Sequence, residues 1–261
     1  MEVSSLPKQI MFVLLALGLA QFACNFGAQV PNVNPPQSSS SSQPTQAGSS
    51  ATGSCANDYL PVKPGVSWTY TGQSTTGNFT RVSTITSVET DSFEREIATT
   101  LSNGTQRTYT DSWKCTPDEL VLQGGPLSTT FQSVYGNATM KTLSTTGVTL
   151  PAHINAGDSW TQDAQLAFTS TQVSVNIALT YNFKAIGLES VTVPAGTFNA
   201  MKIQINVTSQ TTTASRTNNI VVDGFEWFVP GVGAVKSSVG VKVNGTTYPG
   251  TDDQMQSYHI P

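Results

Sequence analysis

Apolar and polar residues alternate along much of the chain after residue 55. The longest uninterrupted run covers residues 173–183, and its apolar members are Val173, Val175, Ile177, Leu179, Tyr181 and Phe183. Shorter runs occupy residues 79–88, 201–207 and 239–243. Because successive side chains of a strand point to opposite faces, these runs predict strands with one apolar face. Such alternation is typical of antiparallel sheets that expose one face to water.

Turn-forming residues separate the runs. They are Asn103-Gly104, Gly124-Gly125-Pro126, Gly187, Pro194-Ala195-Gly196, Asp223-Gly224, Pro230-Gly231 and Asn244-Gly245. Asn-Gly and Asp-Gly between alternating runs are strong hairpin signals. We expect Gly231 and Gly233 to need positive φ in a turn that joins two hairpin strands. No stretch shows a helical stripe. Residues 158–168 come closest, but their Thr and Gln favour a strand.

The pattern therefore predicts an all-β fold, an antiparallel meander with little or no helix beyond the N-terminal segment. One domain would span residues 55–261. Residues 61–70 resemble residues 152–161, since both contain Gly-x-Ser-Trp-Thr. This similarity fits two related halves that meet near residues 145–155. In a Thr-rich chain it also fits chance.

Composition narrows the range of functions. Only 11% of the residues are charged, against about 25% in an ordinary soluble domain. The net charge is −4 and the pI about 5.1, which leaves no basic surface for nucleic acid. Two His and three Cys are too few for a rich metal site.

The N-terminus has the pattern of an export signal. Lys8 precedes an apolar run of about 14 residues that ends at Cys24, which is shorter than the roughly 20 residues a membrane helix needs. With Ala23 before Cys24, residues 1–23 resemble a bacterial lipoprotein signal peptide, which implies that Cys24 carries the lipid. An ordinary secretory signal cut nearby is the alternative.

Residues 24–54 are expected to be the lipid anchor and a disordered Ser/Pro/Gln-rich tether, because residues 25–54 hold no charge and little apolar area. This arrangement predicts an extracytoplasmic protein anchored to a bacterial membrane, on the periplasmic or the cell-surface side. Asn25 does not give the inner-membrane retention signal that Asp would give after a lipidated Cys.

The two remaining cysteines, Cys55 and Cys115, form an even pair in an oxidising compartment, and we predict a disulfide between them. It would close a loop of about 60 residues, worth roughly 4 kcal/mol in the chain-entropy model. Two free thiols are the alternative.

Three segments resemble a family of bacterial exported lipoproteins of unassigned function: residues 59–70, 193–203 and 226–236. The resemblance implies a strongly curved antiparallel sheet, a half-barrel or open barrel similar to lipoprotein-carrier (LolA-like) domains. Those carriers hold acyl chains on the concave face.

Catalytic chemistry is not apparent. The chain has no Gly-x-Ser-x-Gly elbow, His-Glu-x-x-His, Walker or dinucleotide motif. The weak candidates are a set of His153, Asp158 and Ser159, the strand pair Glu94 and Glu96, the turn residues Asp118 and Glu119, and Asp252-Asp253 as a calcium loop. We therefore expect no enzyme activity, metal or cofactor.

The sequence favours an anchored domain that binds an apolar or amphipathic small ligand or an envelope partner. A structural or adhesive surface module without a small ligand is the alternative. A hydrolase of cell-wall glycans is the least favoured, because acidic residues are sparse.

Overall fold

The computed structural model describes residues 55–74, 77–125, 139–169, 174–212 and 217–261. These residues contain thirteen strands and no helix. The strands are β1 (Ser67–Ser74), β2 (Gly77–Val88), β3 (Ser92–Leu101), β4 (Gln106–Thr116), β5 (Glu119–Leu122), β6 (Thr139–Gly147), β7 (Leu150–Pro151), β8 (Ser159–Thr169), β9 (Ser174–Val193), β10 (Gly196–Thr212), β11 (Thr217–Val229), β12 (Gly233–Val243) and β13 (Thr246–His259).

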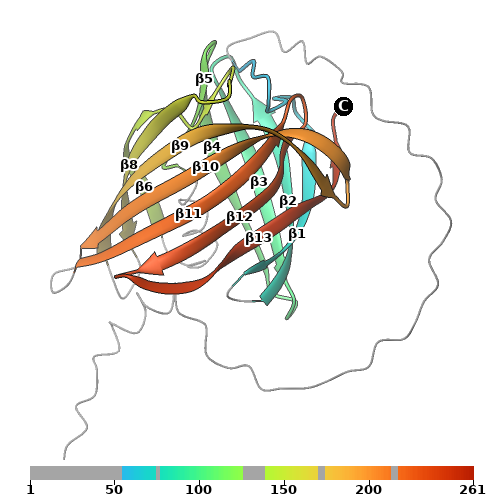
Figure 1. Ribbon diagram of the computed structural model, residues 1–261. Coiled ribbons are helices and arrows are strands. Elements are labelled where there is room, and N and C mark those ends of the chain that lie inside the picture. The colour runs from blue at the N-terminus through green and yellow to red at the C-terminus, as the bar shows by residue number, and fades with distance from the viewer. Residues whose placement is uncertain (1–54, 75–76, 126–138, 170–173, 213–216) are drawn as a thin grey trace, which may run out of the picture.

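All the strands belong to one antiparallel sheet in the order β6-β8-β9-β10-β11-β12-β13-β1-β2-β3-β4-β5-β7. Most neighbours in the sheet are also neighbours in sequence, as in a meander, and β13 returns to pair with β1. Figure 1 shows β9–β12 crossing in front of β2–β4, so one concave face of the sheet encloses the interior. The prediction of an all-β, curved antiparallel sheet is confirmed.

Strand pairing does not close the sheet into a ring, but hydrogen bonds connect its two ends. Thr149, which precedes β7, donates its backbone N–H to Leu120 O (3.1 Å) and its hydroxyl to Gln162 Oε1 (2.8 Å). Gln162, on β8, donates through Nε2 to Leu122 O at 2.8 Å. Gln162 is fully buried. We call Thr149, Gln162 and Leu122 the seam.

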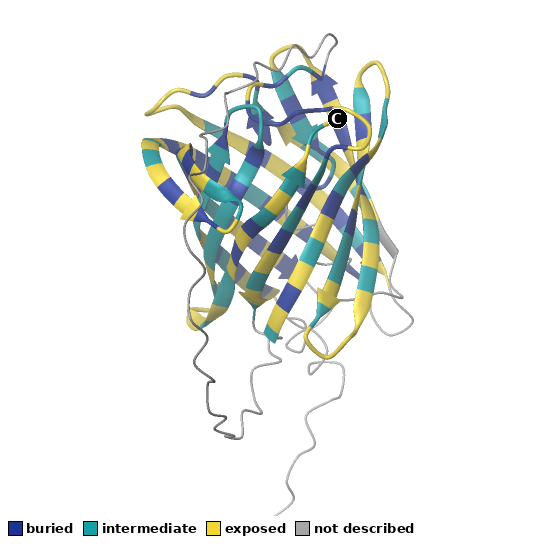
Figure 2. Cartoon of the chain, turned by 90° about the vertical axis from the view of Figure 1, so that its right-hand side faces the viewer, coloured by how far each residue is buried: buried dark blue, intermediate teal, exposed yellow. Residues whose placement is uncertain are grey.

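Burial alternates along the strands, as Figure 2 shows by its alternating dark blue and yellow segments. On β9 the described apolar positions are buried: Val175, Ile177, Leu179, Tyr181 and Phe183. The predicted alternation is therefore confirmed there. We call the face that carries these residues the inner face.

Several predicted turns are also confirmed. Pro194-Ala195 joins β9 to β10. Gly231, with a φ of 71°, lies in the turn between β11 and β12, and Gly233, with a φ of 110°, begins β12. Two predicted turns are wrong. Gly187 lies within β9, beside a β-bulge. Gly224 lies within β11, where an added Cβ would come within 2.2 Å of Ser238 O, so this glycine permits a close approach of two strands.

Cys55 and Cys115 are joined by a disulfide, with Cα atoms 4.8 Å apart. It attaches the start of the described chain to β4, two residues after Trp113. The predicted signal peptide, Cys24 and the tether lie outside the described residues. Where the chain is described, no helix is long and apolar enough to span a membrane.

The two segments of similar sequence, residues 61–70 and 152–161, adopt the same local geometry. Three backbone hydrogen bonds of 2.8–3.2 Å recur at equivalent positions. Around the first segment they are Gly65 N to Ile85 O, Ile85 N to Val66 O and Val66 N to Lys63 O. Around the second they are Gly157 N to Ala185 O, Ala185 N to Asp158 O and Asp158 N to Asn155 O. A β-bulge follows in each case, after Ile85 on β2 and after Ala185 on β9. An internal duplication of the chain would produce this repeated arrangement of hydrogen bonds and bulge. That the two halves arose by duplication stays a prediction.

Candidate functional site

Charged side chains gather on the inner face, where apolar residues would be expected. They come from strands β2, β3, β4, β11 and β13, and five of them are Arg81, Arg95, Asp111, Glu226 and Asp253. Arg107 of β4 also lies on this face, and its strand partner Thr99 pairs in turn with Arg81. The pairing register places them on one face, because paired residues of neighbouring strands point the same way. We call these five residues the charged cluster.

Arg81 and Asp253 form the first ion pair of the cluster. The Arg81 Nη2 and Asp253 Oδ2 atoms lie 2.5 Å apart, and the Asp253 side chain is only 3% exposed. The guanidinium also lies over the ring of Tyr70, 4.8 Å from its centroid. Burial raises the pKa of Asp253, and the neighbouring Arg81 opposes that effect.

Arg95 and Asp111 form the second ion pair, with Arg95 Nη2 2.6 Å from Asp111 Oδ2. Trp113 Nε1 donates to the other carboxylate oxygen at 2.9 Å. The Arg95 guanidinium lies 5.2 Å from the Trp113 ring. Asp111 is therefore saturated with donors, as a buried carboxylate requires.

Glu226 differs from the other two carboxylates of the cluster. Within the part of the chain that the structure describes, it has no hydrogen bond and no ion pair. Burial and the charge of Asp253 raise the pKa of Glu226 to about 7, although Arg81 and Arg95 oppose the rise. Burial also raises the pKa of the neighbouring Tyr70.

The inner face is apolar on the strands that cross in front of the cluster. In the described residues, no inner position of β8, β9 or β10 carries a charged side chain. The buried apolar residues there include Leu166, Val175, Ile177, Leu179, Ile203, Ile205 and Val207. We call these inner positions the apolar side. The inner face thus has one charged and one apolar side.

The two arginines keep accessible surface although they point inwards. The side chain of Arg81 is 31% exposed and that of Arg95 is 20% exposed. The guanidinium groups of the charged cluster are therefore accessible, whereas the residues of the apolar side are buried.

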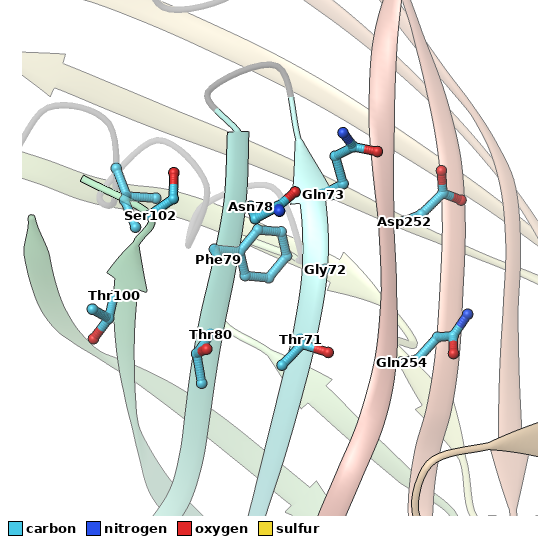
Figure 3. Close-up of a pocket in the computed structure, with 11 residues that line it drawn as sticks. Thr71, Gly72, Gln73, Asn78, Phe79, Thr80, Thr100, Ser102, Asp252 and Gln254 are labelled. Carbon is cyan, nitrogen blue, oxygen red and sulfur yellow. The ribbon is translucent and has the colours of Figure 1, made fainter. Parts of the chain in front are cut away.

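Two pockets lie elsewhere on the sheet. One of about 570 Å³ is bordered by β1, β2, β3 and β13, and Figure 3 shows that hydroxyl and amide groups such as those of Thr80, Asn78 and Gln254 surround it. Asp252 is the single charged residue in its lining. The other, of about 590 Å³, includes Trp160 and Lys184. Neither pocket contains a member of the charged cluster.

The structure does not assemble the three residues that could have formed a Ser-His-Asp set. His153 Nδ1 lies 2.6 Å from Asp58 Oδ2, and this contact raises the pKa of His153. Asp158 instead accepts a bond from Asn155 N at 2.7 Å, and Ser159 is an exposed residue at the start of β8. Asp158 serves the turn before β8 and is not the partner of His153.

The acidic candidates are dispersed. Glu94 and Glu96 are exposed on the outer face of β3. Asp118 lies in the turn before β5, and Glu119 begins that strand. The interpretation of Asp252-Asp253 as a calcium loop is wrong, because both residues lie within β13 and a strand directs neighbours to opposite faces. In the described ranges no three acidic, His or Cys residues group as metal ligands.

Sequence reasoning missed the charged cluster, although a signal was present. Arg81 lies between Phe79 and Ser83 at the inward positions of β2, and Arg95 lies between Phe93 and Ile97 on β3. A charge at an inward position of an alternating strand is unusual, because charges are rarely buried unless they are paired. The alternation itself could therefore have pointed to the cluster.

The fold is similar to that of two solved structures. One is a candidate lipoprotein from Parabacteroides distasonis, with 19% identity and a TM-score of 0.54, covering 78% of this chain and 99% of its own. The other is a candidate exported protein with a YmcC-like fold from Bacteroides fragilis, with 17% identity and a TM-score of 0.50, covering 79% and 100%. At these identities the likeness concerns the fold alone.

No curated protein matches the chain. Residues 63–242 match the DUF3108-like family. The match begins in the turn before β1 and ends in β12, so it includes Arg81, Arg95, Asp111 and Glu226. Because this match covers more than half of the sequence, the chain belongs to the DUF3108-like family.

Proposed function

We propose that this chain is an extracytoplasmic, lipid-anchored and non-catalytic binding protein that holds an amphipathic small ligand against the inner face of its sheet. The observation that carries the proposal is the division of that face into a charged and an apolar side. Binding sites for small molecules are typically apolar, with a few polar groups that orient the ligand. The inner face has this composition.

Both sides contribute to the binding of such a molecule. Each methylene that leaves water for the apolar side would contribute about 0.8 kcal/mol. The charged cluster would orient the polar end of the ligand, because Arg81 and Arg95 retain accessible surface. An amphipathic ligand matches both the charged and the apolar side of the inner face.

Two observations support the extracytoplasmic location. The similar solved structures are candidate lipoprotein and exported proteins. The Cys55–Cys115 disulfide suits an oxidising compartment. The anchor itself depends on Cys24 and the N-terminal sequence, which resembles a lipoprotein signal.

Native mass spectrometry of the full-length protein, isolated from bacterial envelopes in a mild detergent, tests the proposal. We expect a species that is heavier than the lipidated chain and that loses a solvent-extractable mass. The control is the same protein after extraction and refolding, which should show the mass of the lipidated chain. If untreated preparations show only that mass, and added amphiphiles do not bind, the ligand-binding role is wrong and a structural or partner-binding module is favoured.

A further inference from the structure

Charge is distributed unevenly over the outer face of the sheet. We propose that the outer face of strands β9–β12 lies against a membrane surface of anionic phospholipids, while the outer face of β2–β5 points away from it. The lipid anchor of the proposed function would hold the domain near the membrane, and the outward charges would decide how the domain is turned there. This orientation rests on the anchor and is independent of a ligand on the inner face.

Lysines dominate the outer face of β9–β12. They are Lys184, Lys202, Lys236 and Lys242. Lys184, for example, follows the buried Phe183, and a strand directs neighbours to opposite faces. The outward carboxylates of these four strands are Glu189 and Asp223, so four lysines and two carboxylates give this face a net charge of +2. We call it the basic face.

The basic face has lysines to offer to an anionic partner. Within the part of the chain that the structure describes, Lys184 and Lys236 form no ion pair with a carboxylate. The other two lysines contact their carboxylates at 3.3 and 4.0 Å across partly exposed side chains. Ion pairs of this kind contribute little to stability, so lipid phosphate groups can compete with the carboxylates.

The opposite side of the molecule is acidic. Figure 1 shows β9–β12 in front of β2–β4, so the outer faces of these two groups of strands point in opposite directions. The outer face of β2–β5, with its turns, carries Lys114 and six carboxylates, a net charge of −5. The carboxylates are Glu89, Asp91, Glu94, Glu96, Asp118 and Glu119. We call it the acidic face.

The other charges of the described residues do not offset this difference. Those at β6 and β8 are Lys141, Asp158 and Asp163, and those at β13 or before β1 are Asp58, Lys63 and Asp252. Each of these two groups has one lysine and two carboxylates. On the inner face three arginines stand against three carboxylates. The largest difference in charge therefore lies between the basic and the acidic face.

The field of a membrane acts mainly on the face nearest to it. The negative potential of an anionic leaflet falls off within a Debye length, about 8 Å at physiological salt. The net charge of the whole chain, −4, therefore does not decide the contact. The basic face is attracted and the acidic face is repelled. Because the anchor supplies the affinity, this difference needs only to turn the domain.

Exposed apolar side chains adjoin the basic face. Ile186 and Leu188 are 46% and 59% exposed, and they lie on β9 between Lys184 and Glu189. Proteins that lie on a membrane combine lysines with apolar side chains, which enter the region of the headgroups. Apolar contact would therefore add to the electrostatic attraction at this place.

The reactivity of single lysines on liposomes tests the orientation. Full-length lipidated protein is anchored to liposomes of phosphatidylcholine, alone or with one-third phosphatidylglycerol. Reductive methylation by formaldehyde and an uncharged amine borane is followed at each lysine by mass spectrometry. We expect methylation of Lys184, Lys236 and Lys242 to be about 3- to 10-fold slower on the anionic liposomes, and Lys63 and Lys114 to stay within about twofold. High salt should remove the protection.

Two triple variants show whether the charge of the basic face is responsible. Replacing the three protected lysines by glutamine should abolish the protection of Lys202, the fourth lysine of the basic face. The matched control, Lys63→Gln/Lys114→Gln/Lys141→Gln, removes the same charge from other parts of the surface and should preserve the protection of Lys184. Circular dichroism confirms that both variants fold.

Four results would overturn the contact with lipid. Equal methylation on anionic and neutral liposomes would mean that the orientation is wrong, while the anchor and the ligand-binding role stand. Protection that depends on the density of protein, without anionic lipid, would assign the basic face to a second copy of the chain. Protection in native envelopes alone would assign it to a protein partner. If the protein floats with neither kind of liposome, the proposed anchor is wrong, and the orientation with it.

Discussion

Arg81 and Asp253 are 172 positions apart in the chain, yet their side chains form an ion pair of 2.5 Å on the inner face. The pair spans β2 and β13, which lie on either side of β1. It thus connects the first strands of the sheet to the last. Asp253 has almost no contact with water, so its charge depends on Arg81 for compensation.

Removing one partner of this pair should be more destabilising than removing both. We expect Asp253→Ala to lower the free energy of unfolding by about 3–5 kcal/mol, since it leaves the Arg81 charge without its partner. The double variant Arg81→Met/Asp253→Leu should cost less than the sum of the single changes. Urea denaturation measures all of these values.

The exposed pair of Lys242 and Asp223 is the control, because its atoms are 4.0 Å apart and its side chains are 54% and 50% exposed. Breaking it should cost less than about 1 kcal/mol. Equal losses at the two pairs would contradict the structural role of the Arg81–Asp253 pair.

The second prediction concerns the seam of Thr149, Gln162 and Leu122, which connects the two ends of the sheet. Gln162→Met preserves the approximate volume of a fully buried side chain but removes the bond that Gln162 donates to Leu122 O and the bond that it accepts from the Thr149 hydroxyl. Leu122 O keeps the bond from Gly125 N, and the Thr149 hydroxyl oxygen keeps the bond from Leu122 N. We expect the free energy of unfolding in urea to fall by about 1–3 kcal/mol, the contribution of two buried hydrogen bonds. Gln165→Met, at an exposed position of the same strand, is the control and should be nearly neutral.

The disulfide makes a third prediction. The double variant Cys55→Ala/Cys115→Ala opens a loop with a sequence separation of 60. It should lower the free energy of unfolding by about 4 kcal/mol, because the unfolded chain regains the entropy of that loop. Reduced wild-type protein should lose a similar amount. If oxidised and reduced wild-type protein unfold at the same urea concentration, the bond does not stabilise the domain.

Gly233 makes a fourth prediction. Its φ is 110°, and an added Cβ would lie 3.0 Å from Trp68 Nε1. Gly233→Ala should therefore combine backbone strain with a close contact to a buried indole and cost about 2–4 kcal/mol. Gly104→Ala is the matched variant, with a φ of 82° and no atom near the added Cβ, and should cost about 1 kcal/mol. Equal losses would show that the Trp68 contact has no effect.

The strands were predictable from sequence because alternation depends only on the burial of one face. Residues 173–183 indicated the inner face of β9 before any contact was known, and residues 158–168 predicted β8 nearly to its ends. Gly187 and Gly224 misled the prediction, because glycine marks a bulge or a close strand contact as well as a turn.

The candidate site was not predictable in the same way. Arg81 and Asp253 are paired only because β13 returns to β1, and this long-range pairing leaves no local pattern. Glu226 was considered only as part of a hairpin motif, and its lack of a partner emerges when the neighbouring strands are placed. Local patterns thus predicted the sheet, whereas the site depends on how distant strands meet.

The last prediction concerns pH. Because the pKa of Glu226 is raised, we expect the free energy of unfolding to depend on pH. Its pKa rises from 4.5 to about 7 on folding, chiefly through burial and then through Asp253, while Arg81 and Arg95 oppose the rise. Between these two pH values the folded state binds more protons than the unfolded state. The Glu226 contribution to the free energy of unfolding should therefore fall as the pH rises from about 4.5 to 7 and stay constant above that.

Glu226→Gln removes this dependence. We expect the variant to match the wild type near pH 4.5 and to exceed its free energy of unfolding by about 2–3 kcal/mol at pH 8, because the amide carries no charge to bury. Urea denaturation at pH 4.5, 6 and 8 measures the difference, and Glu94→Gln on the outer face should show none. A constant difference between Glu226→Gln and wild type at all three pH values would mean that Glu226 does not titrate in this range, because only a shifted titration makes the difference grow with pH.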